Sequence, residues 1–217
     1  MRPIVAGSQC AGSVRYYAAA VAAGVLLIDD RERHLPLRHS HHRYVIDGPN
    51  GPVTLTVPIV HSTCTMATTM ADVRIADHGN WQRLHWGALY SAYGRSPFFD
   101  FIADELHDII YSNTTSLLEF NMQLHRLVVD FMALPIETHL VSETTVPADA
   151  IDLRHRLGQR KPDDLPLVDV PYYQVWSSRH PFTPSMSILD LAMNTGREGL
   201  LTLLAMAASG GDGASAS

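Results

Sequence analysis

The chain opens with an alternation of apolar and polar segments that is typical of α/β proteins. An apolar segment at 4–6 is followed by a loop of small residues and then by apolar positions at helical spacing across 14–23. That spacing predicts a helix with one buried face. Ser13 is a favoured N-cap residue and Gly24 a favoured helix end. The apolar run at 25–28 then predicts a buried strand, which gives the order strand, loop, helix and strand.

The next predicted elements are a hairpin and three helices. Apolar segments at 44–46 and 53–60 flank a stretch rich in glycine, proline and asparagine, and they predict two strands joined by a tight turn. Apolar positions at helical spacing then predict helices over 81–93, 97–110 and 116–134. The middle of the chain is therefore expected to be helical.

The last third of the chain mixes strand, loop and helix signals. Apolar segments at 138–142 and 168–176 are strand candidates, and the charged segment between them, 152–166, is typical of a loop. Two capping-box patterns follow and predict two short helices with a break near Gly196. From residue 208 onward only small and polar residues occur, which predicts a disordered tail.

Together these elements predict one α/β domain over residues 1–207 and a tail over 208–217. We expect a single short, mostly parallel sheet with covering helices and a helical middle segment. Its strands are predicted near 4–6, 25–28, 53–60, 138–142 and 168–176.

Composition and charge exclude several classes of protein. The 217 residues are 46% hydrophobic and 18% charged, which is ordinary for a globular protein and excludes a disordered or collagen-like chain. The formal net charge of −6 makes nucleic acid an improbable partner. The longest apolar run, 16–28, is interrupted by Gly24, so no membrane span is predicted. With two cysteines and no signal-like N-terminus, we expect a cytoplasmic protein, and its single lysine, Lys161, argues against lysine chemistry.

The loop at 8–13 is the first candidate for ligand binding. A loop that leads into a helix N-terminus exposes backbone N–H groups and the positive end of the helix dipole, which suits an anion near Ser8 and Gln9. Such a position would also favour a thiolate at Cys10. The loop has neither a dinucleotide fingerprint nor a P-loop motif. The alternative interpretation is a tight turn with a good N-cap.

Histidines are concentrated in one polar segment, at His34, His39, His41 and His42. In an extended segment His39 and His41 would share a face, so zinc at His34, His39 and His41 is one hypothesis. Solvated surface histidines are the commoner outcome for such a segment. We therefore predict no metal site, and the sequence indicates no particular cofactor.

Two polar positions lie within predicted helices. His85 shares a helix face with Trp81, an arrangement that is usual in a core, although His85 lining a pocket would suit an acid or a base. Asp190 and Asn194 are four residues apart on one helix face. The alternative for this pair is helix capping, in which Asp190 binds back to Ser187 and Asn194 ends the helix.

Several motifs occur in an order that is specific for one family. The strongest are Trp81-x-Arg83-x-His85-Trp86, Ser91-Ala92-Tyr93, Ser96-Pro97-Phe98-Phe99, Tyr173-Gln174-Val175 and the run from Phe182 through Ser187, Asp190 and Asn194 to Gly196. Over most of residues 1–207 the chain resembles the WbqC-like family of bacterial proteins. It departs from the family pattern at 10–12, where the family carries proline and aromatic residues, and at His42, where the family often has asparagine.

The resemblance implies a place in the biosynthesis of bacterial surface polysaccharide, the O-antigen. It is consistent with a transferase that moves an acyl or aminoacyl group onto an amino sugar. The departures lie where a ligand pocket is expected, which points to an altered substrate. The alternative is a non-catalytic binding or assembly protein, because no complete nucleophile motif such as Gly-x-Ser-x-Gly is present.

We predict that the polar residues of these motifs converge on one small anionic or sugar-linked ligand. Arg43 would make a forked contact with the anion, and His85 would move a proton. The predicted site comprises His85 and Asp190 as catalytic residues, with Ser8, Gln9, Arg43, Tyr93, Gln174 and Asn194 as substrate-binding residues. The alternative is that Arg43 and Asp190 form a buried ion pair while His85 packs under Trp81. The oligomeric state stays open.

Overall fold

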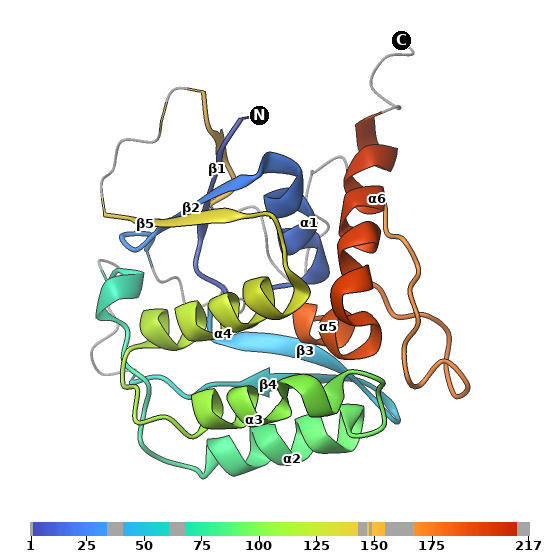
Figure 1. Ribbon diagram of the computed structural model, residues 1–217. Coiled ribbons are helices and arrows are strands. Elements are labelled where there is room, and N and C mark those ends of the chain that lie inside the picture. Colours follow the sequence, from blue (N-terminus) through green and yellow to red (C-terminus); the bar gives the residue numbers. More distant parts are fainter. Residues whose placement is uncertain are drawn as a thin grey trace.

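A parallel sheet joins the start of the chain to its middle (Figure 1). The computed structural model describes residues 2–33, 41–60, 68–142, 147, 149–154 and 167–211. Residues 209–211 are described by their backbone alone. The sheet has the order β5-β2-β1-β6, and every neighbouring pair is parallel. Its strands are β1 (Ile4–Gly7), β2 (Val25–Asp29), β5 (Glu137–Val141) and β6 (Ile151–Asp152). The strands predicted near 4–6, 25–28 and 138–142 are thus confirmed.

The helix α1 (Val14–Ala23) connects β1 to β2 and has the ends that its sequence predicts. The Ser13 hydroxyl accepts a hydrogen bond from the backbone N–H of Tyr16 at 3.2 Å, as an N-cap does. Gly24 ends the helix with a φ of 73°, in the left-handed region that glycine adopts most readily. The strand–loop–helix–strand opening is therefore fixed by local signals.

The predicted hairpin forms, but it stands apart from the parallel sheet. Strands β3 (Arg43–Gly48) and β4 (Gly51–Thr56) pair antiparallel with each other only. The prediction that the strand near 53–60 joins the main sheet was wrong. A two-residue turn forces the two strands to pair side by side, and β4 is largely exposed, as one face of an antiparallel ribbon can be.

The prediction of a strand near 168–176 was also wrong. The described part of this segment is extended or turned without a strand partner, and Pro171 lacks the N–H that a ladder requires. The fourth strand is β6 instead, whose second residue, Asp152, begins the segment that was predicted to be a loop. It is anchored by the N–H groups of Ile151 and Leu153, which donate to Pro3 and Val5. A two-residue strand carries no periodic signal.

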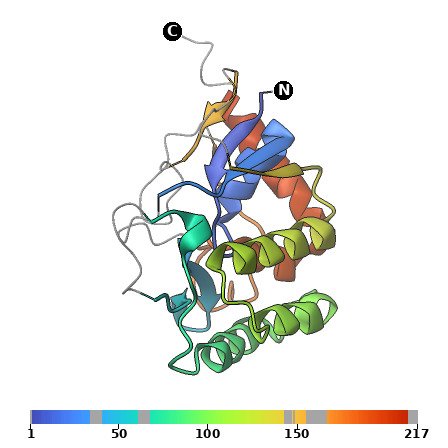
Figure 2. The same ribbon diagram turned by 90° about the vertical axis from the view of Figure 1, so that its left-hand side faces the viewer.

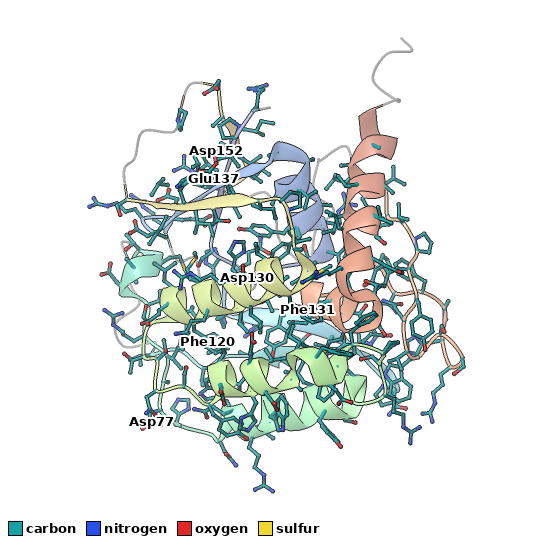
Figure 3. The ribbon with its side chains drawn as sticks, viewed as in Figure 1. Asp77, Phe120, Asp130, Phe131, Glu137 and Asp152 are labelled. Carbon is teal, nitrogen blue, oxygen red and sulfur yellow. The ribbon has the colours of Figure 1, made fainter. Side chains whose placement is uncertain are left out.

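The three helices of the middle segment are confirmed as α2 (Trp81–Tyr93), α3 (Phe99–Ile110) and α4 (Leu117–Met132). In Figure 1, α4 lies between the parallel sheet above and the β3–β4 hairpin with α2 and α3 below. The label of Phe120 in Figure 3 lies on the side of α4 that faces α3, and its ring meets Trp81 edge to face at 5.6 Å. The core is therefore continuous from the sheet through α4 to the lower helices.

The C-terminal region divides near Gly196, as predicted. Helix α5 (Ile188–Thr195) passes through the 3-10 turn η4 (Gly196–Glu198) into α6 (Gly199–Gly211), which packs against α1. Gly196 has a φ of 56°, and a Cβ there would lie 2.7 Å from the ring of Phe98. Helix α6 extends past residue 207, and 212–217 lie outside the described residues.

These elements form a mixed α/β fold with a short parallel sheet, as the sequence predicts. Within the part of the chain that the structure describes, no helix has the length and apolar character needed to cross a membrane.

Candidate functional site

Polar residues from six segments of the chain lie around the carboxyl ends of the parallel strands. The ends of β2 and β5 point to the left in Figure 1, so this side faces the viewer in Figure 2. In open parallel sheets, ligands bind beyond these strand ends. We call this region the carboxyl edge. Contacts with one another or with the strand ends join Ser8, Asp29, Asp30, Glu32, His41, Asn121, Ser142 and Arg154. We include Arg43, which follows His41 by two residues at the start of β3.

Asp29 and Arg154 connect two strand ends of the carboxyl edge. Arg154 Nη1 donates to Asp29 Oδ2 at 2.7 Å, and Arg154 also donates to Asp152 through Nε and Nη2. The second oxygen of Asp29 accepts from the backbone N–H of Arg31 at 2.8 Å. The bonds to Asp152 and Asp29 raise the pKa of Arg154. Both charges are therefore satisfied within the chain, which is the pattern of a structural ion pair.

Asp30, by contrast, keeps one oxygen unsatisfied. Its Oδ2 accepts a hydrogen bond from Ser142 Oγ at 2.8 Å. Its Oδ1 is buried and has no hydrogen-bond partner among the described residues. A buried polar atom is normally paired. This oxygen is consequently a candidate acceptor for a ligand hydroxyl or amino group.

A buried carboxylate and a buried histidine meet beside the end of β1. Glu32 Oε2 lies 3.4 Å from His41 Nε2, and both side chains are almost wholly buried. The Glu32 carboxylate also lies against Gly7, where a Cβ would fall 1.4 Å from Oε2. Asn121 Nδ2 donates to Ser8 Oγ at 3.2 Å and to the His41 carbonyl at 2.9 Å. These contacts hold the segment before β3 against the end of β1.

Arg43 follows this segment as the first residue of β3. The side chain is half-buried, and it makes no hydrogen bond or ion pair within the described ranges, although its Nε is buried. The alternative of a buried ion pair with Asp190 is not realised, because Asp190 binds other partners. The carboxyl edge therefore holds a guanidinium that is available to an anion.

Four of the predicted site residues come together in a second region, near the other end of β3. Asp190 accepts hydrogen bonds from Tyr172 Oη, from Gln174 Nε2 at 2.9 Å and from Asn194 Nδ2 at 3.2 Å, and it also interacts with the Tyr93 hydroxyl. We call these five residues with Asp47 the Asp190 cluster. Burial raises the pKa of Asp190, and the four hydrogen bonds act against that rise.

Asp47 is the second carboxylate of the Asp190 cluster. Its backbone N–H donates to the Tyr93 hydroxyl at 2.9 Å, while its own carboxylate is fully buried. Neither carboxylate oxygen has a hydrogen-bond partner among the described residues, and His180 Nε2 lies 3.5 Å from Oδ1. Burial and the nearby charge of Asp190 raise the pKa of Asp47 to about 6, and His180 acts in the opposite direction. In this region of low polarity, the charge of Asp190 therefore disfavours the ionised form of Asp47.

The capping interpretation of Asp190 was wrong. The backbone N–H of Ser187 donates to Val45 rather than to the Asp190 carboxylate, which turns toward Tyr172 and Gln174. Asn194 also does more than end a helix, because its Oδ1 accepts from the backbone N–H of Val175 at 3.0 Å. Asp190 and Asn194 thus fix the extended segment before α5 rather than the helix end.

His85 occupies a position in the core between β3, β4 and α2. Its Nδ1 pairs with the Tyr44 hydroxyl at 3.1 Å, and its Nε2 faces the Thr56 carbonyl at 3.0 Å. Burial lowers the pKa of His85 to about 4, against the effect of the Thr56 bond. The Trp81 ring meets the imidazole edge to face at 5.1 Å. Both ring nitrogens are engaged, so the neutral imidazole crosslinks the hairpin to α2.

The predicted residues therefore divide between two places instead of converging on one. Tyr93, Gln174, Asp190 and Asn194 lie in the Asp190 cluster, while Ser8 and Arg43 lie at the carboxyl edge. The half-buried Gln9 follows Ser8 and lies against Gly12, where a Cβ would be 3.2 Å from Gln9 Oε1. Tyr44, the residue that reaches His85, follows Arg43 directly, and successive strand residues face opposite sides.

The loop at 8–13 is covered by the chain rather than open to a ligand. The backbone N–H of Val14 donates to the Met186 carbonyl at 2.9 Å, and Ser187 Oγ donates to the Ala11 carbonyl at 2.8 Å. Cys10 is completely buried, and burial raises the pKa of its thiol. The prediction of a favoured thiolate was therefore wrong, because loss of water outweighs the helix N-terminus.

Only one of the three histidines in the zinc hypothesis lies within the described residues. His34 and His39 lie outside the described residues, and His41 lies beside Glu32. Within the described ranges, no group of three or more histidine, cysteine or acidic side chains is arranged to hold a metal ion.

Sequence reasoning missed Glu32, Asp47, Asn121 and Tyr172. Glu32 stands in a run of alternating charge, which is typical of a solvated surface. Asp47 opens a turn motif, and Asn121 lies on an otherwise apolar helix stripe. An amide on an otherwise apolar helix face needs hydrogen-bond partners, and this sequence signal could have pointed to Asn121 and its bonds to Ser8 and His41.

Comparison with known proteins places the chain in a family. A sequence model of the WbqC-like protein family matches residues 15–161, which is more than half of the chain. The matched range contains Arg43, His41 and the ends of β2 and β5, whereas Ser8 and Asp190 lie outside it. No curated protein and no solved structure matches the chain. The family match shows that the chain belongs to the WbqC-like protein family.

Proposed function

We propose that the chain is a transferase that binds an anionic, sugar-linked molecule at the carboxyl edge and moves an acyl or aminoacyl group onto an amino sugar. Its place would be the biosynthesis of bacterial surface polysaccharide, the setting that the family resemblance implies. The observation that carries the proposal is Arg43, whose guanidinium has a buried Nε and no partner among the described residues.

A guanidinium is permanently charged and presents five donors in a plane that matches phosphate or carboxylate. Leaving part of it buried without a partner costs free energy, and a bound anion would remove that cost. Arg43 is also well placed, since it follows the segment that Glu32 and Asn121 hold against the ends of the parallel strands. An anion at Arg43 would therefore lie where ligands of such sheets bind.

The acidic side of the carboxyl edge supports a sugar as the rest of the ligand. Asp30 Oδ1 is a buried acceptor without a partner among the described residues. Carboxylates accept hydrogen bonds from hydroxyl and ammonium groups. A molecule that carries both an anion and a hydroxylated or amino-substituted ring would satisfy Arg43 and Asp30 together.

A non-catalytic binding role is the second candidate, and the two polar residues first expected to catalyse favour it. Both ring nitrogens of His85 are engaged, and Asp190 accepts hydrogen bonds from Tyr172, Gln174 and Asn194 inside the cluster. A protein that binds the same ligand without turnover would need only Arg43 and its neighbours.

Calorimetric titration with uridine diphosphate, UDP-N-acetylglucosamine and acetyl coenzyme A tests the binding step. We expect one of these anions to bind the wild type and to bind Arg43→Gln at least tenfold more weakly. Arg83→Gln is the matched control, because Arg83 is exposed on α2 and away from the carboxyl edge. Equal affinity of wild type and Arg43→Gln, or no binding of any anion at millimolar concentration, would contradict the proposal.

Turnover separates the two candidates. The protein is incubated with acetyl coenzyme A and a UDP-linked amino sugar, and the products are read by mass spectrometry. A mass gain of one acetyl group on the sugar supports the transferase. Binding that depends on Arg43 without any product would favour the non-catalytic role.

A further inference from the structure

A short loop between β6 and α5 is closed at its base by a pair of hydrogen bonds. Gln174 Nε2 donates to the Thr183 carbonyl at 3.0 Å, and the backbone N–H of Thr183 donates to Gln174 Oε1 at 2.9 Å. We call the residues between them, 175–182, the 175–182 loop (orange, lower right in Figure 1). The paired bonds fix the two ends of this loop, so its outer part needs a separate attachment to stay against the rest of the chain.

His180 attaches the outer part of the 175–182 loop to the β3–β4 hairpin. Its Nε2 lies 3.2 Å from the carbonyl oxygen of Gly48, the last residue of β3, and 3.5 Å from Asp47 Oδ1. Its Nδ1 lies 3.3 Å from the carbonyl oxygen of Pro181. The His180 side chain keeps 20% of its surface exposed, so the ring lies at the surface of the protein, within reach of water.

The partners of His180 require a proton on both ring nitrogens. A carbonyl or carboxylate oxygen has no hydrogen to donate, so each nitrogen that bonds to one must be the donor. Neutral imidazole has one N–H, and imidazolium has two. Only the charged ring therefore makes both carbonyl bonds. These bonds to Gly48 and Pro181, together with the charge of Asp47, raise the pKa of His180 against the effect of burial.

Two buried histidines of the chain, His85 and His125, are held differently. His85 faces the hydroxyl of Tyr44, and His125 faces two hydroxyls. A hydroxyl donates or accepts, so a neutral ring satisfies both sets of partners. Burial lowers the pKa of both rings to about 4. His180, at the surface and bonded to acceptors, instead favours the charged form.

The Asp47 carboxylate lies beneath His180 and gives the loop a second response to pH. Neither of its oxygens has a hydrogen-bond partner among the described residues. The other titratable groups around it are Asp190 of α5 and the hydroxyls of Tyr93 and Tyr172. Burial and the charge of Asp190 raise the pKa of Asp47 to about 6, and His180 acts in the opposite direction. Once His180 is neutral, an ionised Asp47 gains free energy by reaching water, which favours release of the loop.

We infer that His180 is a pH-dependent clasp, which holds the 175–182 loop on the β3–β4 hairpin as an imidazolium and releases it as a neutral ring. The closed loop binds the proton of His180 more tightly than the open loop does. Closure is therefore favoured below the ordinary histidine pKa of 6.5 and is lost as the pH rises through the higher pKa of the closed form. Release admits water to Asp47. Neither the clasp nor its test depends on a ligand at the carboxyl edge.

Amide hydrogen exchange of the 175–182 loop at pH 6.0 and pH 8.5 tests the clasp. A peptide of the same sequence gives the reference rate at each pH, which removes the effect of pH on exchange itself. We expect the protection of the wild type to fall about three- to tenfold between the two pH values, the range that corresponds to one lost hydrogen bond. Equal protection at both pH values would overturn the inference.

Two variants at position 180 sharpen the test. His180→Gln has no charged form and should exchange at pH 6.0 as fast as the wild type does at pH 8.5. His180→Arg keeps a cation with several donors and should stay protected at both pH values. His78→Gln is the matched control, because His78 is exposed in the loop before α2. Wild-type protection of His180→Gln at pH 6.0, or loss of protection of His180→Arg at pH 8.5, would contradict the clasp.

Ring spectra of ¹⁵N-histidine-labelled wild-type protein give a measurement that needs no variant. We expect both nitrogens of His180 to carry a proton at pH 6.0, and the ring to titrate above the ordinary histidine pKa of 6.5. Cross-relaxation between its ring protons and Gly48 should be present at pH 6.0 and should weaken as the ring loses its proton. A ring that titrates at or below 6.5, or that stays beside Gly48 after it titrates, would overturn the clasp whether or not the variants fold.

Discussion

The carboxyl edge and the Asp190 cluster are both rich in polar side chains, but their charges are satisfied in different ways. In the Asp190 cluster, hydrogen-bond donors from three chain segments surround the Asp190 carboxylate, although the neighbouring Asp47 carboxylate accepts no hydrogen bond from the described residues. At the carboxyl edge, Arg43 Nε and Asp30 Oδ1 are buried without partners among the described residues. Asp190 is thus satisfied within the chain, whereas Arg43 and Asp30 carry opposite charges and each keep a buried atom that no described residue binds.

This difference separates polar side chains that stabilise the fold from polar side chains that are available to a ligand. A satisfied buried network fixes one arrangement of the chain, because each donor or acceptor loses free energy when its partner moves. The Asp190 cluster accordingly joins α2, the segment from 172 to 174 and α5. Unsatisfied buried groups cost free energy until a ligand binds them. Polarity alone, as the sequence presents it, does not distinguish the two.

The largest expected effect lies at the carboxyl edge itself, at Gly7. Gly7→Ala places a methyl group on the Glu32 carboxylate and should lower the free energy of unfolding by about 3 kcal/mol. Urea denaturation measures the change. Gly87→Ala in α2 is the matched control: no atom lies within 4 Å of its Cβ, and the variant should gain ~0.5–1 kcal/mol in stability. A stable Gly7→Ala variant would show that Glu32 can retreat without cost.

The comparison between the two regions predicts unequal costs for removing a carboxylate. Asp190→Ala strips Tyr172, Gln174 and Asn194 of a buried acceptor and should cost about 3 kcal/mol. Asp30→Ala removes a carboxylate with one exposed partner, Ser142, and should cost less than about 1 kcal/mol. Both are measured by thermal and urea unfolding at pH 7. Equal costs would remove the distinction between the regions.

Asp47 gives a smaller effect that depends on pH. Because its pKa rises to about 6 from an ordinary value near 3.8, the folded protein binds this proton more tightly than the unfolded chain. The resulting stability is fully present below pH 3.8 and is lost as the pH rises to about 6. Asp47→Asn should therefore be more stable than the wild type at pH 7.5, by on the order of 2 kcal/mol.

The difference between the variants should shrink when unfolding is measured at pH 4.5. Asp77→Asn is a suitable control, since Asp77 is exposed in the loop before α2 (Figure 3) and should show no such pH dependence. A wild type that gains stability relative to Asp47→Asn as the pH rises would show that His180 outweighs burial at this carboxylate.

Much of the fold followed from short-range patterns. The opening strand, helix and strand carry their own caps and apolar periodicity, as Ser13 and Gly24 illustrate. The three middle helices and the break at Gly196 are equally local. The two errors concern pairing: β4 pairs only with β3, and β6 completes the sheet from two residues. Strand partners lie far apart in sequence, so no local pattern names them.

The candidate site shows the same division between what local sequence patterns predict and what long-range packing decides. The sequence by itself determined which residues are polar within apolar segments, and it singled out Arg43, Tyr93, Gln174, Asp190 and Asn194 as positions that need partners. Only the tertiary structure decided which of them find those partners in the chain. Asp190 is satisfied because α2 and the segment before α5 fold onto it, whereas no described segment brings an acceptor to Arg43. Hydrogen bonding acts over about 3 Å, and the distances that decide it are set by packing between elements far apart in the chain.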